Sequence, residues 1–490
     1  MNRALRRISI ASLLMFGVLL LNVNYLQAFQ ADSLTARPAN VRAFEQQFQQ
    51  QRGEIVAADG AVLAKSVPTK NTVYKFQRVY PDGPLYSAVT GYDSIFGASG
   101  LELAEDKLLS GSDPKLLVRN FVNMITGKKP QGAQVVTSID PKAQRAAFDA
   151  LRHTGKSGGL VALNPATGAI IAMVDAPTFD PNKYTTFSGA TLDKIDSAYR
   201  ADPAQPLLNR AVNETYPPGS TFKVVTSSAL FSAGSYNPQT PVDAPTQLNL
   251  PGSATKLINF DGLPCGGGGQ VQVIYAFTVS CNTVFGNLGM KIRSPALHAQ
   301  ANKFGMNDPN LTIPIPVSQS NSPLLTDKAQ TALSAVGQFD DTVTPLQEAM
   351  FSAAIANGGA LMRPYMVQKV EAQDLSSVES TSPQVYRQTV TAPVADQVKS
   401  MMLSVTEDPA GTAHAASADV RASGITVGAK TGTAQTGINN TGLDDAVFTC
   451  FAQSGNQRIA IGVVVKAGGE GADAAAPIAM AVIKAYLGQQ

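Results

Sequence analysis

Apolar runs that begin at residue 158 predict β-structure. Residues 158–175 read GGLVALNPATGAIIAMVD, two apolar runs on either side of the turn-forming segment 164–168. This arrangement predicts a hairpin of two buried strands. Three further apolar runs near the end of the chain predict strands at 425–435, 446–453 and 458–467.

Helical spacing of apolar residues dominates the middle of the chain. In 221–233, Phe222, Val225 and Leu230 lie on one face of a helix. Further helices are predicted at 273–292, at 345–357 and over the last ten residues. Strands at both ends of the region and helices between them predict an α+β domain at 156–490, an antiparallel sheet with helices on both faces.

Residues 32–155 show shorter and more varied patterns. Apolar alternation around an Asp-Gly turn predicts a hairpin at 52–66, and helices are predicted at 100–111 and 139–153. We therefore expect a smaller mixed α/β N-terminal domain, a pedestal or dimerisation-like module without a catalytic cluster. The segment with Arg78, Tyr80 and Tyr86 could form either a contact surface or a solvated loop, and we expect the loop.

The first 31 residues have the pattern of a membrane anchor. Arg3, Arg6 and Arg7 precede the segment 8–31, which contains no charged residue and is mostly apolar. This segment is long enough for one transmembrane helix, and positive charge before it favours a cytoplasmic N-terminus. The alternative is a cleaved signal peptide. In both cases we expect the rest of the chain outside the cytoplasm.

The charge balance argues against a nucleic-acid partner. The 490 residues include 38 basic and 36 acidic side chains, which gives a formal net charge of +2. No strong electrostatic field for nucleic acid follows from such a balance. The three histidines, His153, His298 and His414, lack metal-ligand spacing with another His, Cys or Asp, so we expect neither a metal nor another cofactor.

Three cysteines are compatible with an oxidising compartment. A glycine-rich loop separates Cys265 from Cys281, and we expect these two to form a disulfide. Cys450 then remains unpaired in an apolar strand. The alternative is three unlinked thiols.

The segment YPPGSTFKVV (216–225) places a serine and a lysine where the predicted helix begins. Lys223 follows Ser220 by three residues, so the two side chains share a helix face, with about 5–6 Å between their Cβ atoms. A serine hydroxyl needs a base to become a good nucleophile, and a lysine becomes that base when burial lowers its pKa. This pair is therefore a candidate nucleophile and base.

The Ser-x-x-Lys spacing alone is weak evidence, because it also occurs at 253–256, where we expect a loop. Two more motifs strengthen the interpretation. One is Ser280-Cys281-Asn282, beside the predicted helix 273–292, and the other is the segment KTGT at 430–433 in a predicted strand.

In this order, the three motifs resemble those of penicillin-binding proteins, and more narrowly those of the class B, monofunctional D,D-transpeptidases. The resemblance covers most of the chain. Besides the membrane anchor, the segments that carry it are RGEIVAADG (52–60), NPATGAIIAM (164–173), YPPGSTFK (216–223), SCNT (280–283), VTPLQ (343–347) and KTGTAQ (430–435).

This resemblance implies acyl transfer through a serine ester. Ser220 matches the nucleophile that attacks the D-Ala-D-Ala bond of a peptidoglycan stem peptide, and an acceptor amine then takes the acyl group. Lys223 matches the base, and Ser280 resembles the hydroxyl that relays a proton to the leaving amine. The backbone N–H groups of Ser220 and Thr433 match the oxyanion hole.

The resemblance also implies a substrate-binding set. Asn282 resembles the amide that holds the peptide and orients the lysine base. Lys430 looks like a fixed positive charge near the substrate carboxylate, and the hydroxyls of Thr431 and Thr433, on either side of Gly432, resemble donors to it. Charge-assisted hydrogen bonds of this kind are the strong ones.

Implied partners are stem peptides, β-lactam antibiotics, the cell membrane, a membrane glycan polymerase and division or elongation proteins. A D,D-carboxypeptidase would carry the same motifs. A β-lactamase would need a deacylating glutamate, and none of the glutamates between the lysine motifs lies in a sequence typical of one; they are Glu348, Glu371, Glu379 and Glu407. A non-enzymatic β-lactam sensor should carry a longer cytoplasmic part than seven residues.

Overall fold

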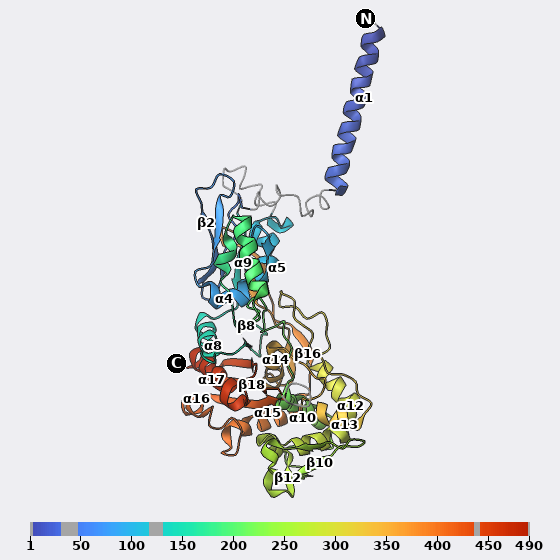
Figure 1. The fold of residues 1–490 in the computed structure, drawn as a ribbon, viewed down its shortest axis with the longest axis vertical. Helices are drawn as coiled ribbons and strands as arrows, with labels where there is room; N and C mark the ends of the chain where they lie inside the picture. The colour runs from blue at the N-terminus through green and yellow to red at the C-terminus, as the bar shows by residue number, and fades with distance from the viewer. Residues whose placement is uncertain (1–2, 31–47, 117–130, 436–441, 489–490) are drawn as a thin grey trace.

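The computed structural model describes residues 3–30, 48–116, 131–435 and 442–488 (Figure 1). Helix α1 (Arg3–Tyr25) contains the one stretch within these ranges that is long and apolar enough to cross a membrane, Leu5–Tyr25. Figure 1 shows the N-terminal domain around β2 and α4, and next to it the larger part around β18 and α14.

The larger part is built on the predicted antiparallel sheet of five strands. Its strand order is β17-β18-β19-β7-β8, and every neighbouring pair is antiparallel. The strands are β7 (Gly158–Leu163), β8 (Ile170–Ala176), β17 (Thr426–Ala434), β18 (Asp445–Ser454) and β19 (Gln457–Val465). Both ends of the region thus contribute strands, as the hydrophobic pattern predicts, and β17 forms one edge.

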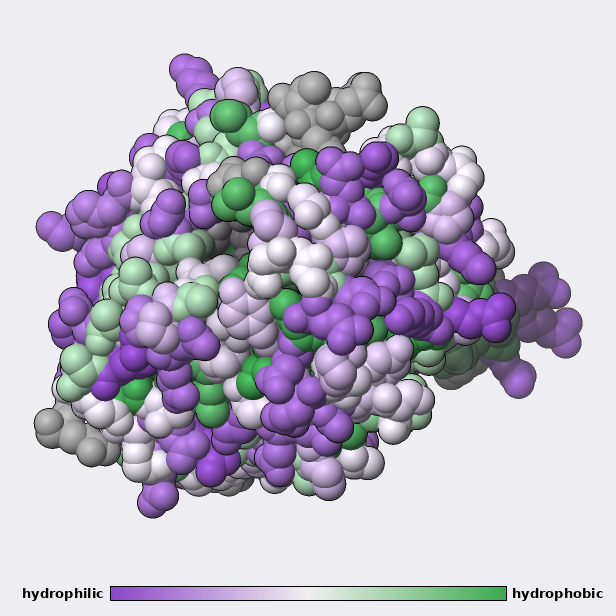
Figure 2. All heavy atoms as spheres, turned by 90° about the horizontal axis from the view of Figure 1, so that it is seen from below, coloured by the Kyte–Doolittle hydropathy of each residue, from purple (hydrophilic) through white to green (hydrophobic). Residues whose placement is uncertain are grey.

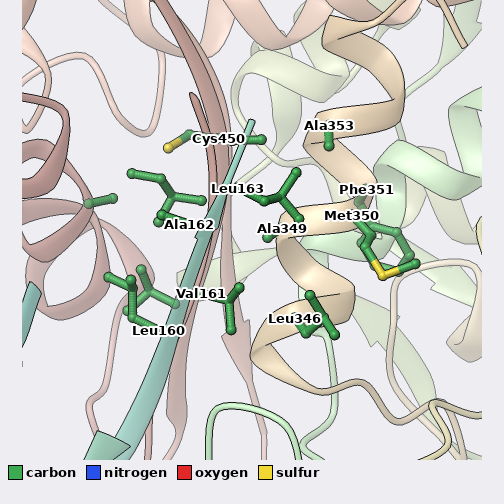
Figure 3. Packing of buried hydrophobic residues seen from close by; sticks show 14 of the residues in the cluster. Leu160, Val161, Ala162, Leu163, Leu346, Ala349, Met350, Phe351, Ala353 and Cys450 are labelled. Atoms are coloured by element: carbon green, nitrogen blue, oxygen red, sulfur yellow. The ribbon is translucent and has the colours of Figure 1, made fainter. Parts of the chain in front are cut away.

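Helices cover both faces of this sheet. The helices that pack on it include α8 (Pro141–His153), α14 (Pro345–Ala356) and α17 (Ala476–Leu487). Along β7, Val161 and Leu163 point toward α14, whereas Leu160 and Ala162 point to the opposite side (Figure 3). All four are buried, which explains why β7 is a continuous apolar run instead of an alternating one.

Two predicted helices are interrupted. The helix expected at 100–111 is split at Glu105 into α5 (Gly100–Ala104) and α6 (Asp106–Ser110), and the second ends at left-handed Gly111. The helix expected at 273–292 is split into α11 (Val273–Thr278) and α12 (Asn282–Lys303).

The N-terminal sheet has six strands in the order β15-β14-β6-β1-β2-β3. They are β1 (Ile55–Val56), β2 (Val62–Pro68), β3 (Phe76–Val79), β6 (Gln134–Thr137), β14 (Val367–Glu371) and β15 (Ser377–Ser380). Strands β1 and β2 form the hairpin predicted at 52–66. Strand β14 pairs with β6, with Val370 opposite Val135, so this sheet crosses the boundary predicted between residues 155 and 156.

Other elements also cross that boundary. Helix α8 precedes residue 156 but packs on β8 and α17 of the larger part. The 3-10 helix η2 (Pro181–Thr185) follows residue 156 but contacts β3 of the N-terminal sheet. The two parts of the molecule therefore exchange segments, which no local sequence pattern reveals.

The prediction of a solvated loop around Arg78 and Tyr80 is wrong. The two residues are only 2% and 1% exposed. Arg78 donates to Glu102 Oε1 at 2.6 Å, and Arg52 donates to Glu102 Oε2 at 2.7 Å. The Tyr80 hydroxyl donates to the same carboxylate at 3.1 Å. Two guanidinium groups compensate the buried glutamate, which is the condition under which a charged side chain is tolerated inside a domain. Tyr86, at 5% exposed, is also buried.

Residues 241–272 form two small two-stranded sheets at the end of the molecule that Figure 2 faces. Hydrophilic and hydrophobic residues are interspersed on that surface. One sheet pairs β9 (Pro241–Asp243) with β12 (Gln270–Gln272), and between them in the chain β10 (Gln247–Asn249) and β11 (Lys256–Ile258) form a hairpin.

Candidate active site

The first predicted motif lies on the turn that begins a helix. Ser220 is in the 3-10 helix η3 (Gly219–Phe222), which leads directly into α10 (Lys223–Ser232). Gly219 has a φ of +54°, and a Cβ there would lie 2.9 Å from Thr433 O on β17. Glycine is therefore suited to this position both by its conformation and by the close approach of the edge strand.

Lys223 lies completely inside the protein with its amine against Ser220. Its Nζ is 2.9 Å from Ser220 Oγ, 2.7 Å from the Ser280 carbonyl O and 2.7 Å from Asn282 Oδ1. Burial, together with the positive charge of Lys430, lowers the pKa of Lys223 well below its usual value. A neutral amine has two N–H groups, which it can donate to the Ser280 carbonyl and to Asn282 Oδ1, because these two oxygens can only accept. Its lone pair then faces the Ser220 hydroxyl. The arrangement is suited to removing the proton of Ser220.

The second motif connects two lysines. Ser280 Oγ is 2.8 Å from Lys430 Nζ and 3.3 Å from Lys223 Nζ. Ser280 has a φ of +60°, a left-handed conformation that ends α11 before α12 begins. The prediction of one helix at 273–292 fails at this residue, because the left-handed turn directs the backbone carbonyl and the hydroxyl of Ser280 at Lys223.

The third motif lies on the edge strand β17, beside the Ser220 turn. A side chain added at Gly432 would lie 2.9 Å from Pro218 O, which shows how closely strand and turn pack. Lys430 is fully buried, and its Nζ also donates to Thr431 O at 3.0 Å. Burial lowers the pKa of Lys430 to about 7. The residues of all three motifs therefore meet around the Ser220 turn.

One hydroxyl next to the third motif, that of Thr412, is not apparent from the sequence. Thr412 lies on the loop after α15 (Ala392–Glu407), and its Oγ1 is 2.7 Å from Thr431 Oγ1. Its backbone N–H donates to Thr278 O at 3.3 Å, which ties the loop to the end of α11. Nothing in the local sequence marks this threonine, because its relation to β17 is tertiary.

The second Ser-x-x-Lys sequence is exposed to solvent. Ser253 is in an exposed turn, and Lys256 begins strand β11 and donates to Gln247 Oε1 at 3.1 Å. Neither residue is on a helix; Ser253 lies in the predicted loop, whereas Lys256 already belongs to strand β11. Across residues 3–30, 48–116, 131–435 and 442–488, no group of three His, Cys, Asp or Glu side chains is placed to hold a metal ion.

A disulfide borders the site. The structure joins Cys265 to Cys281, the residue between Ser280 and Asn282, with an S–S distance of 2.06 Å. Asn282 Nδ2 donates to Ile258 O at 3.2 Å, so the end of strand β11 also contacts the motif. Cys450 is unpaired and buried in β18.

We expect peptide mapping without reductant to recover one fragment pair that joins Cys265 to Cys281, while Cys450 is alkylated only after unfolding, because it is buried. Recovery of both Cys265 and Cys281 in alkylated form, without reduction, would contradict the bridge. Alkylation of the reduced chain under the same conditions is the control for the accessibility of the two thiols.

Comparisons with known proteins agree with this geometry. A family model described as the penicillin binding protein transpeptidase domain matches residues 158–484, and one described as the penicillin binding protein A dimerisation domain matches 52–135. The chain is 39% identical over 500 residues to the peptidoglycan D,D-transpeptidase PbpA of Mycolicibacterium smegmatis, with 99% of each chain covered. It is 37% identical over 497 residues to PbpA of Mycobacterium tuberculosis, again with 99% of each covered.

Solved structures extend the likeness to the fold. The ceftriaxone acyl-enzyme complex of penicillin-binding protein A from M. tuberculosis superposes with a TM-score of 0.84 at 35% identity, covering 90% of this chain and 100% of that one. The imipenem acyl-enzyme complex gives a TM-score of 0.84 at 37% identity, covering 90% and 99%. The predicted resemblance and fold class are confirmed, and the chain belongs to the class B penicillin-binding proteins.

Proposed function

We propose that this protein is a serine-type peptidoglycan D,D-transpeptidase that cross-links stem peptides and is acylated by β-lactams. The observation that carries the proposal is the 2.9 Å distance from Ser220 Oγ to the Nζ of fully buried Lys223. Burial favours the neutral amine, and only the neutral amine can accept the serine proton. The relatives' names and their β-lactam acyl-enzyme complexes support the same reaction.

The first half-reaction forms an acyl-enzyme. Ser220 Oγ attacks the carbonyl carbon of the D-Ala-D-Ala bond while Lys223 takes its proton. The Ser280 hydroxyl, 3.3 Å from Lys223 Nζ, relays a proton to the leaving D-alanine amine as the C–N bond breaks. The backbone N–H groups of Ser220 and Thr433 stabilise the oxyanion. In the second half-reaction an acceptor amine attacks the ester, and its proton returns to Ser220 along the same path.

The remaining motif residues bind the substrate. Asn282 holds both Lys223 and the peptide backbone. Lys430 and the hydroxyls of Thr431 and Thr433 bind the terminal carboxylate, and Gly432 between them lets the strand pack closely against the Ser220 turn. A β-lactam presents its own carboxylate to the same groups, and its ring keeps the leaving amine tethered after acylation.

Protonation of Lys430 should control the alkaline side of the acylation profile. Burial lowers its pKa to about 7, so as pH rises through this value the amine loses the charge that attracts the substrate carboxylate. We expect the second-order rate constant for acylation by a fluorescent penicillin to fall above this pH. In Lys430→Arg the guanidinium stays charged, so the decline should begin at least about one pH unit higher. Profiles recorded from pH 6 to 9 on both proteins test this, and superimposable declines would contradict it.

The proposal includes the location and the domain organisation. Residues 1–31 form a cytoplasmic tip and a membrane anchor, since Arg3, Arg6 and Arg7 precede the apolar span and no charge follows it up to residue 31. Residues 32–155 form the pedestal, which receives β14 and β15 from the catalytic domain at 156–490 and contributes α8 to it. The catalytic part lies outside the cytoplasm, beside a membrane glycan polymerase and division or elongation proteins.

The test uses the full chain in detergent with a stem-peptide thioester and a D-amino acid acceptor. Formation of the exchange product is expected. Free acid as the sole product would identify a carboxypeptidase, and rapid turnover of penicillin a β-lactamase. Stable penicillin acylation without either stem-peptide product would identify a sensor. Protein first saturated with penicillin is the control for reaction at the same serine.

A further inference from the structure

A buried glutamate lies directly beneath the Ser220 turn. Glu348 is on the first turn of α14, fully buried, and its Oε1 is 2.8 Å from Thr221 Oγ1. In the sequence, Glu348 does not lie in a motif typical of the deacylating glutamate of a β-lactamase. Its carboxyl group is closed off from solvent, and one of its oxygens contacts Thr221.

The sheet is shaped to admit this glutamate. Gly462 on β19 faces α14, and a side chain there would put its Cβ 2.6 Å from Glu348 Cβ and 2.2 Å from Pro345 O. The Thr449 hydroxyl on β18 donates to the backbone carbonyl of Glu348. Helix α14 is thus held against the sheet, and the carboxyl group points at the residue that follows Ser220.

The number of protons available at Thr221 determines which group donates in the hydrogen bond between Thr221 and Glu348. Thr221 Oγ1 has one proton and two close oxygen neighbours, Pro218 O at 2.7 Å and Glu348 Oε1 at 2.8 Å. The Pro218 carbonyl can only accept, so it takes the threonine proton. The proton between Thr221 and Glu348 must then belong to the carboxyl group of Glu348.

The surroundings of the second carboxyl oxygen of Glu348 also favour the protonated, neutral acid. Glu348 Oε2 is buried and has no hydrogen-bond partner within the described part of the chain. An ionised carboxylate left this way would carry a large desolvation cost, whereas the carbonyl oxygen of a protonated acid costs much less. Burial also raises the pKa of Glu348 to about 8.

We propose that Glu348 is a positioning residue for the nucleophile, held as a neutral acid that donates to Thr221, which in turn donates to Pro218 O. Ser220 lies between Pro218 and Thr221, so this two-bond chain fixes the turn that aims its Oγ at Lys223 and its backbone N–H at the oxyanion. The inference rests on the proposed function, and it gives Glu348 no contact with the substrate.

The test measures the first-order acylation constant and the noncovalent Kd for a fluorescent penicillin, using the full chain in detergent. Glu348→Gln keeps an uncharged donor of the same shape, and we expect acylation within about twofold of wild type. Glu348→Leu and Thr221→Val each break the chain, and we expect acylation about tenfold slower with an unchanged Kd, because a misdirected nucleophile affects the chemical step. Since the two residues act in series, the double variant should be no slower than either single variant.

Three results would overturn the inference: wild-type acylation in Glu348→Leu, acylation in Glu348→Gln as slow as in Glu348→Leu, or multiplied losses in the double variant. If thermal unfolding shows that Glu348→Leu does not fold, the acylation rates of Thr221→Val and Thr221→Ser are compared instead. Only the serine keeps the hydroxyl, so equal rates in the two would also refute the chain. A wild-type protein that penicillin fails to acylate would instead refute the proposed function.

Discussion

Replacing Ser220 by alanine should abolish covalent labelling by a fluorescent penicillin. The hydroxyl that faces Lys223 Nζ at 2.9 Å is the atom that forms the ester in the proposed reaction, and alanine has no substitute for it. Loss of a serine nucleophile typically lowers the rate by about 10⁴-fold or more, so the labelled band should fall to background. The variant should fold, because the substitution removes one oxygen from a half-buried side chain.

The chain contains its own matched control for this experiment. Ser253 also precedes a lysine by three residues, but it lies in an exposed turn. Ser253→Ala should therefore be labelled like wild type. Persistent labelling of Ser220→Ala would assign the nucleophile to another residue, and mass spectrometry of the labelled peptide would identify it.

Replacing Lys223 by methionine should slow acylation by about 10²- to 10⁴-fold, the usual contribution of a general base. Methionine fills the apolar volume of the buried stem but cannot accept the proton of Ser220. The noncovalent Kd should change less than the rate, since Lys223 acts on the nucleophile. Stopped-flow labelling separates the two constants.

Lys256→Met is the control, because Lys256 belongs to the second Ser-x-x-Lys sequence and is exposed on β11. An unchanged acylation rate in Lys223→Met would exclude Lys223 as the base and favour the other buried amine, Lys430. The second amine is 2.8 Å from Ser280 Oγ, so it is the next group in the same network.

Local chemistry made the nucleophile predictable. The relation between Ser220 and Lys223 is one helical turn, and the sequence contains every residue needed to recognise it. The strands of the catalytic sheet were predictable for a similar reason, because a strand covered on both faces is largely apolar, as the run LVAL of β7 shows.

Long-range contacts explain what could not be predicted. The apolar spacing of 273–292 continues through Ser280, so no local signal reveals the left-handed turn that brings its oxygen atoms to the two lysines. Arg78 and Tyr80 look like residues of an exposed loop until Glu102, more than twenty positions away, lies against them. The contact of Glu348 was unpredictable for the same reason, since its partner Thr221 is 127 residues distant in sequence.

The strand pairing between β6 and β14 has a thermodynamic consequence. Strand β6 precedes the nucleophile in the chain and β14 follows it. The pedestal sheet therefore cannot melt unless β14, which follows α14 of the catalytic domain in the chain, separates from β6. The two parts should then unfold in one cooperative transition. An antibiotic bound covalently to one part, if it stabilises that part, will raise the apparent melting temperature of the other through this shared transition, without contact between the drug and the pedestal.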